Sequence, residues 1–400
     1  MRGSTDVVDD GLLERVRERL AGTVGAPGPG AVAAAVRAEA RGVIGDSDIL
    51  HALRELETEL VGAGPLAPLL AAPDVTDVLV NAPDEVWVDR GRGLEKATVR
   101  FADEEAVRRL AQRLALAAGR RLDDAQPWVD GQLVAEDAAA HTVRLHAVLA
   151  PVARGGTALS LRVLRPATQG LDELAAGGAI APAAMSLLHG IVRARLSFLV
   201  AGGTGAGKTT LTSALLGSVD TSHRIVCVED APELAPRHPH VISLVARPAN
   251  AEGVGAISVR DLVRQALRMR PDRIVVGEVR GPEVIDMLSA MNTGHDGGAC
   301  TVHANSPREV PARLEALAAA AGDAGAPMGR AALHSQLAAA VQVVMHVRRR
   351  PSGERELAEI AVLEPDSGRC CVVPAWTAAD GDGPGRGRLD ALVAGEGVRT

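Results

Sequence analysis

The chain has 400 residues, 47% of them apolar and 23% charged, a composition typical of a globular protein with about two or three domains. Its net charge of −7 and pI of about 5.9 argue against an extended nucleic-acid-binding surface. The sequence has no signal-peptide pattern, no apolar run of membrane-spanning length and no Cys-x-x-Cys pair among its four cysteines. We therefore expect a cytoplasmic protein, in a reducing compartment, that associates with the inner face of a membrane only peripherally.

The first part of the chain divides into an arm and a small domain. Helical patterns over residues 5–24 and 30–60, separated by a glycine and proline cluster, predict a helical N-terminal arm over residues 1–60. Short alternating strands around one amphipathic helix then predict an α+β N-terminal domain over residues 61–165. The expected elements of this domain are strands at 75–80, 85–89, 143–149 and 158–164 and a helix at 104–119.

A different pattern of secondary structure begins after a predicted linker at residues 166–178. Strand and helix patterns alternate over residues 179–365, which is typical of a parallel-sheet α/β domain. The segment 366–400 is rich in glycine and aspartate from Asp380 onward, and we expect this tail to be partly disordered. The predicted fold class is α/β, with a smaller α+β domain in front of the larger domain.

A complete phosphate-binding motif lies between the apolar stretch 196–200 and a helical pattern at 210–219. Its glycines let successive backbone N–H groups curl around phosphates, and the following helix N-terminus adds a favourable dipole. Lys208 is expected to place a positive charge on the phosphates, and the Thr209 hydroxyl can ligate Mg²⁺. The candidate nucleotide-binding residues are Gly202, Gly203, Thr204, Gly205, Ala206, Gly207, Lys208, Thr209 and Thr210.

Hydrolysis also needs carboxylates, and two apolar strand patterns downstream end in acids. The first ends in Glu229 and Asp230, and the second ends in Glu278. Because the carboxyl ends of the strands of an open α/β sheet face the ligand crevice, we expect these acids near the phosphate-binding loop if both strands belong to its sheet. A helix with a capping box at Ser258 and Asp261 and another helix at 282–291 are expected between and after them.

Two histidines flank a short strand in a glycine-rich segment beyond the second acidic strand. His295 precedes this strand and His303 follows it. A histidine beside a terminal phosphate can sense it through a hydrogen bond, whereas a lone histidine is often only structural or exposed. The residues alone leave both interpretations open.

The ordered set of motifs resembles the type II/IV secretion ATPase superfamily, and within it the Tad/Flp-pilus ATPase branch of the TadA or CpaF type. The resemblance covers residues 60–350. It includes no four-cysteine metal segment of the kind found in general-secretion and type IV pilus extension ATPases. The motifs that carry it are the Walker A loop 202–209, the "Asp box" 225–234, the segment 267–280, the "His box" 292–305 and the front-domain segments 62–70, 75–81 and 160–162.

The resemblance implies a RecA-like motor domain that hydrolyses ATP with Mg²⁺ and works in a homo-oligomeric ring, usually a hexamer, on polytopic inner-membrane platform proteins. It implies that nucleotide lies between the N-terminal and motor domains. By its motif positions, Glu278 matches the Walker B glutamate that shares Mg²⁺ with Thr209. The other implied residues are the Asp-box acids Glu229 and Glu233, the His-box residue His303 and the phosphate-contacting Arg144 and Arg162.

The sequence departs from the family in the front domain, where Gln132 stands in place of an arginine and the following turn at 134–142 is altered. This weakens the expectation of phosphate contacts from that domain. Our leading hypothesis is a ring ATPase that powers pilus assembly or secretion. The alternatives are a nucleic-acid translocase or helicase on the same core, which the acidic balance disfavours, and a nucleotide-gated scaffold without turnover, which the intact acids disfavour.

Overall fold

The computed structural model describes residues 62–134, 142–250, 253–294, 296–320 and 329–395, together with positions 15, 16, 19, 34–36, 38 and 39. The chain divides into two compact units, Met1–Leu164 and Arg165–Thr400. Most of the expected helical arm lies outside the described residues. Its described positions are helical, and Arg19 contacts Glu39 across 2.9 Å.

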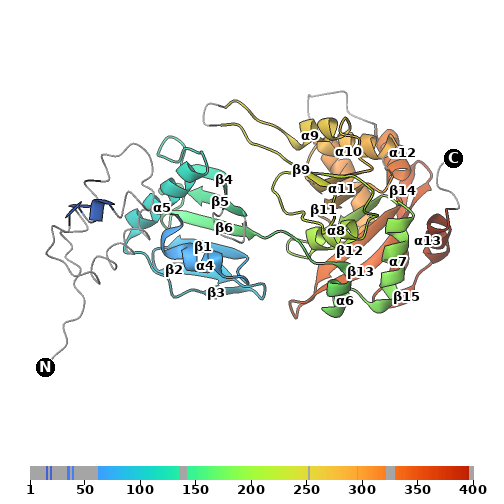
Figure 1. The fold of residues 1–400 in the computed structure, drawn as a ribbon, viewed down its shortest axis with the longest axis horizontal. Coiled ribbons are helices and arrows are strands. Elements are labelled where there is room, and N and C mark those ends of the chain that lie inside the picture. Colours follow the sequence, from blue (N-terminus) through green and yellow to red (C-terminus); the bar gives the residue numbers. More distant parts are fainter. Residues whose placement is uncertain are drawn as a thin grey trace. The chain divides into compact units, whose positions relative to one another are not determined.

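The N-terminal unit is built on a six-stranded antiparallel sheet (Figure 1). The order of its strands is β3-β2-β1-β6-β5-β4, and its helices pack on one face, where alternate strand residues form the core. Its elements are η1 Gly64–Leu66, α4 Ala67–Ala71, β1 Asp77–Ala82, β2 Glu85–Asp89, β3 Leu94–Lys96, α5 Glu104–Ala117, β4 Trp128–Val134, β5 Thr142–Val148 and β6 Ala158–Leu164. The α+β prediction and its expected helix are confirmed, and Asp103 caps that helix by accepting a bond from the Ala106 amide.

The C-terminal unit has a nine-stranded mixed sheet in the order β15-β14-β13-β12-β7-β11-β10-β8-β9 (Figure 1). The strands from β12 to β9 run parallel, and β13 to β15 add an antiparallel edge. The strands are β7 Phe198–Ala201, β8 Ile225–Glu229, β9 Val241–Val245, β10 Arg273–Val279, β11 Ala299–Val302, β12 Val343–Arg349, β13 Arg355–Asp366, β14 Arg369–Thr377 and β15 Gly381–Asp382.

Helices cover both faces of this sheet, which explains why its central strands are apolar throughout. One core contains residues of α6, α7, α8 and α13, and the other contains residues of α9 to α12, with Ile225 and Val226 of β8 pointing to opposite sides. The helices are α6 Leu171–Ala176, α7 Pro182–Arg193, α8 Lys208–Gly217, α9 Val259–Ala266, α10 Glu283–Asn292, η2 Pro307–Glu309, α11 Val310–Ala319, α12 Arg330–Ala340 and α13 Arg386–Val393. The expected capping box at the start of α9 is confirmed. None of the described helices has the length and apolarity to cross a bilayer.

The expectation of disorder after Asp380 is wrong for the described part of that segment. Helix α13 forms there, and Leu389 and Leu392 are buried in the core beside α7 and β14. Gly190 of α7 lies so close to Val393 that an added Cβ would be 3.0 Å from it. Burial of two leucines, rather than helix propensity, thus orders this glycine-rich sequence.

Candidate nucleotide-binding site

The functional residues of the C-terminal unit gather at the edge of the sheet where its parallel strands end. Strand β7 runs into the phosphate-binding loop, β8 ends at Glu229, and β10 carries Glu278 next to its last residue. The pairing of β7 with β11, β11 with β10 and β10 with β8 places all of these ends on one edge. The structure therefore confirms that both acidic strands belong to the sheet of the phosphate-binding loop.

Glycine is required at two points of the loop for different reasons. Gly207 has a φ of 97°, a left-handed conformation that other residues adopt only with strain, and it caps α8. Gly202 leaves no room for a side chain, because an added Cβ would lie 2.4 Å from the carbonyl oxygen of Val347. The loop thereby curls tightly against β12 and leads into the N-terminus of α8, the arrangement of backbone amides that suits a phosphate.

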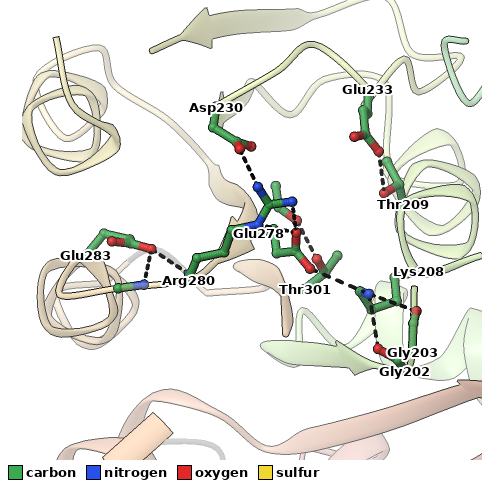
Figure 2. A network of polar contacts seen from close by, with 12 residues as sticks. Gly202, Gly203, Lys208, Thr209, Asp230, Glu233, Glu278, Arg280, Glu283 and Thr301 are labelled. Carbon is green, nitrogen blue, oxygen red and sulfur yellow. Dashed lines mark hydrogen bonds and ion pairs between the residues drawn. The ribbon is translucent and has the colours of Figure 1, made fainter. Parts of the chain in front are cut away.

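Lys208 points back into the loop (Figure 2) and is only 9% exposed. Its Nζ donates to the carbonyl oxygens of Gly202 and Gly203, each at 3.1 Å, and lies 3.5 Å from Oε1 of Glu278. Burial lowers the pKa of this ammonium group, and the negative charge of Glu278 partly offsets that effect. Carbonyl contacts are weak partners for a buried ammonium, so phosphate oxygens would be strong competitors for it.

The hydroxyl of Thr209 donates to Oε2 of Glu233 across 3.2 Å (Figure 2). Burial raises the pKa of the Glu233 carboxyl, and the bond from Thr209 partly offsets the rise. Of the two Asp-box glutamates singled out in the sequence, Glu233 is thus the one in contact with the phosphate-binding motif.

Glu229 lies deeper than Glu233, with only 2% of its surface exposed. Its Oε1 accepts bonds from the backbone amides of Glu233 (3.1 Å) and Leu234 (2.9 Å), while its Oε2 is buried with no hydrogen-bond partner in the part of the chain that the structure describes. Burial raises the pKa of this carboxyl to about 7 despite those two amides. Its side chain packs against Gly277, where an added Cβ would lie 2.8 Å from Cγ of Glu229. This geometry makes Glu229 a support for the Glu233 turn.

Glu278 sits at an irregularity in β10, where the pairing with β11 shifts between Val276 and Val279. Such bulges re-aim side chains beside functional sites. Thr301 of β11 donates to the carbonyl oxygen of Gly277 at 2.6 Å and so supports the irregular stretch. Glu278 is directed toward Lys208 on one side and toward Arg280 on the other (Figure 2).

Two arginines near the loop were not singled out in the sequence. Arg280 directly follows β10 and bridges Glu278 and Asp230. Its position after an acidic strand end is a signal that a search for strand-terminal charges would find. Arg355 begins β13, and its Nε donates to the carbonyl oxygen of Gly205 at 2.9 Å. No local pattern marks Arg355, because it lies 150 residues from Gly205 in the sequence and reaches the loop only through the pairing of β12 and β13.

His303 is exposed and follows the last residue of β11. Because Val302 pairs with Ala201, His303 is level with Gly202, the first residue of the phosphate-binding loop. His295 lies outside the described residues. The register of the strands thus brings His303 to the same sheet edge as Lys208, and a role beside a terminal phosphate stays a prediction.

Arg144 and Arg162 belong to the N-terminal unit. They are direct cross-strand partners on β5 and β6, and both are exposed on the face of the sheet opposite its core. The same row continues to Gln132 on β4 and to Asp77 on β1, whose carboxylate accepts a bond from Nε of Arg162 at 2.9 Å. Two adjacent guanidinium groups suit a phosphate chemically, and contact with one stays a prediction.

The residues at the edge of the parallel sheet fit a nucleotide and its metal. A cradle of amides begins α8, a buried ammonium has carbonyl oxygens and one carboxylate as its partners among the described residues, and a hydroxyl adjoins a carboxylate. These donors suit phosphate, and the hydroxyl and carboxylate oxygens suit Mg²⁺. Together with the parallel sheet, they define the C-terminal unit as a RecA-like phosphate-binding-loop domain.

Comparison with known proteins identifies the family of the chain. Residues 59–370 match the family described as "Type II/IV secretion system protein", and the chain belongs to that family. A Mycobacterium tuberculosis protein named "Putative conjugal transfer protein" is 67% identical over 339 residues, which are 85% of this chain and 95% of that protein. The Brucella suis type IV secretion system protein VirB11 is 31% identical over 268 residues, 60% of this chain and 72% of VirB11.

A solved structure supports the assignment of the fold. The Legionella pneumophila ATPase DotB resembles this chain with a TM-score of 0.52 and 17% identity, over 76% of this chain and 80% of DotB. The comparison extends over both units. It agrees with the RecA-like domain and the smaller N-terminal domain that the sequence predicts.

Proposed function

We propose that this chain is an Mg²⁺-dependent ATPase that acts as a motor subunit. The observation that carries the proposal is the convergence of an ammonium, a hydroxyl and two carboxylates beside a backbone cradle for phosphate. A protein that only bound nucleotide would need the cradle but would have less use for the carboxylates. The converging side chains are those of Lys208, Thr209, Glu233 and Glu278.

Bound Mg²⁺·ATP would supply the phosphoanhydride bond and the charge of the metal. The amides of the loop and the first turn of α8 hold the phosphates, and Lys208 neutralises charge that develops on the transferred group. The Thr209 hydroxyl would serve as a ligand of Mg²⁺, and Glu278 is the second proposed ligand. Glu278 orients the attacking water and accepts its proton, and Glu233 lies beside the metal position through its contact with Thr209. Glu229 fixes the Glu233 turn through two amides. His303 is the proposed sensor of the terminal phosphate, and Arg144 and Arg162 are proposed further phosphate ligands.

The family and the names of the relatives support a role in a membrane-associated transport or assembly machine. We infer a homo-oligomeric ring, hexameric as in the resemblance to the Tad/CpaF branch, bound peripherally to polytopic platform proteins at the cytoplasmic membrane. The relatives are named for conjugal transfer and type IV secretion, so secretion-type transport stands beside Flp/Tad pilus assembly as the output of the motor. Particle images with nucleotide would reveal the ring, and a monomer under those conditions would refute it.

Mutation of Lys208 gives the sharpest test, because the chain has a built-in control. Its only other lysine is Lys96, in β3 of the N-terminal unit. Lys208→Ala is expected to lower Mg²⁺-dependent ATP turnover by at least about 100-fold, because a buried charge that stabilises the transferring phosphoryl group is lost. Lys96→Ala is expected to keep wild-type turnover. A wild type without turnover, or equal activity of the two variants, would refute the ATPase proposal.

A nucleic-acid motor on the same core remains the competing hypothesis, and it is tested in the same assay. Single-stranded DNA is expected to leave the turnover of the wild type unchanged within about two-fold, because the net charge of −7 provides little attraction for a polyanion. A large stimulation that disappears at higher salt would favour the translocase instead.

A further inference from the structure

Arg280 is the first residue after β10, and its guanidinium lies between two carboxylates (Figure 2). Its Nε donates to Oε2 of Glu278 at 2.6 Å, and its Nη1 donates to Oδ2 of Asp230 at 2.7 Å. The other oxygen of Glu278 faces Nζ of Lys208 at 3.5 Å. A continuous chain of alternating charges therefore joins the phosphate-binding loop to the ends of β10 and β8.

The backbone around Glu278 is held from both sides. Upstream, Thr301 donates to the carbonyl oxygen of Gly277. Downstream, Oε1 of Glu283 accepts bonds from the amides of Arg280 (2.6 Å) and Gly281 (2.7 Å). These contacts fix the backbone on both sides of Glu278. They leave the direction of its carboxylate to be set by Lys208 and Arg280.

An arginine suits this task for a geometric reason. Its planar guanidinium presents several N–H groups in fixed directions, so it can hold two carboxylates at a defined angle, whereas a lysine ammonium acts as a point charge. The side chains of Arg280 and Asp230 are 51% and 39% exposed, and an ion pair this exposed contributes little to folding stability. The consequence of the bridge is therefore expected in the orientation of Glu278 and not in the stability of the fold.

We propose that Arg280 is a positioning residue for the hydrolysis site. It holds the Glu278 carboxylate toward Lys208 and the phosphates, and it uses Asp230 as a second anchor on the neighbouring strand. Arg280 acts on the reaction through Glu278 and does not itself bind nucleotide. This inference rests on the proposed ATPase function and adds a residue to its machinery.

The test compares turnover with nucleotide binding in four variants, Arg280→Ala, Arg280→Lys, Asp230→Asn and the double variant Arg280→Ala/Asp230→Asn. Arg280→Ala is expected to lower kcat about 10- to 100-fold, with KM for ATP unchanged within about two-fold, because only a transition-state interaction is misaligned. Arg280→Lys is expected not to restore kcat. Asp230→Asn should cause a smaller loss, of about 3- to 10-fold, and the double variant should equal Arg280→Ala, because both act through one contact.

Binding provides a readout that is independent of turnover. The Kd of a fluorescent ADP analogue in EDTA is expected to be the same for wild type and Arg280→Ala within about two-fold.

Arg264→Ala is the matched control, because Arg264 is 54% exposed and also pairs with an acid, Asp286 at 2.9 Å. It should behave as wild type. The proposal is overturned if Arg280→Ala keeps its kcat, if its Kd in EDTA rises about ten-fold, or if the losses of Arg280→Ala and Asp230→Asn multiply in the double variant. If instead the wild type has no turnover and Lys208→Ala binds the analogue as tightly as wild type, the ATPase proposal itself fails.

Discussion

At the scale of single side chains, the three glutamates of the site are separated by their surroundings. Glu229 is enclosed, Glu233 contacts Thr209, and Glu278 stands between two cations. The same residue type can therefore serve as a structural support, a neighbour of the metal position and an acceptor of the water proton. Burial and partners, rather than position at a strand end, decide among these roles.

The buried carboxyl of Glu229 predicts a pH dependence of stability. Burial raises its pKa from 4.5 to about 7, so the folded state holds more protons than the unfolded chain between these values. Stability should therefore fall as pH rises through this window, by up to about 3 kcal/mol from this group, and level off above it. Denaturant unfolding of wild type and Glu229→Gln at several pH values measures the effect. The difference between the two should grow from pH 5 to 7.

Glutamine imitates the protonated carboxyl, so Glu229→Gln is expected to be more stable than wild type at the upper end of the window. Asp366→Asn, at the exposed last residue of β13, provides the comparison and should follow the wild-type curve. Parallel curves for wild type and Glu229→Gln would show that Glu229 does not titrate in this range.

The sequence predicted the residues of the loop because their spacing is local, and Lys208, Thr209 and Glu278 do converge. It could not separate Glu229 from Glu233, since the burial of Glu229 depends on Gly277 of another strand. It also missed Arg280, whose role becomes visible only when β8 and β10 are seen as neighbours.

At the scale of elements, the hairpin of β12 and β13 packs against the phosphate-binding loop. Val347 of β12 leaves no space at Gly202, Cδ of Arg355 would lie 3.3 Å from a Cβ added at Gly207, and Nε of Arg355 holds the Gly205 carbonyl. The loop is thus held in its curled form by a hairpin from a distant part of the chain. Preorganisation of this kind strengthens binding by lowering the entropy lost when the ligand arrives.

Arg355→Ala is accordingly expected to weaken nucleotide binding. The loss of one hydrogen bond and of the packing against Gly207 should raise the Kd of the ADP analogue about 3- to 10-fold, measured by fluorescence titration. Arg369→Ala, an exposed arginine at the start of β14, should leave the Kd unchanged. Equal Kd values for Arg355→Ala and wild type would mean that the loop keeps its shape without the hairpin.

Elements with a clear local pattern of apolar residues were the easiest to predict. Strand β8 and the helix α5 follow their local patterns closely, and strand β6 matches its predicted bounds. The antiparallel edge β13–β15 and helix α13 were not predicted, because their order comes from packing against α7 and β12, which lie far away in the sequence. Only the tertiary contacts distinguish α13 from a solvated tail.

At the scale of the molecule, the connecting segment, which follows β6 and contains Ala167, is hydrogen-bonded to the turn that carries Glu233. Ala167 donates its backbone N–H to the carbonyl oxygen of Glu233 at 3.0 Å, and it forms an isolated parallel bridge with Leu234. The side chain of Glu233 meets Thr209. Glu233 thus contacts the connecting segment through its backbone carbonyl and the phosphate-binding motif through its side chain. A shift in one of these two contacts is therefore expected to displace the other.

This connection predicts that removal of a single backbone donor changes turnover. Ala167→Pro eliminates the N–H, so the Glu233 turn loses one of its supports, and kcat should fall about 3- to 10-fold while the Kd of the ADP analogue changes less than about two-fold. Ala167→Gly keeps the N–H and should remain near wild type, although it loosens the chain. If the proline and glycine variants hydrolyse ATP equally well, the bond to Glu233 has no part in catalysis.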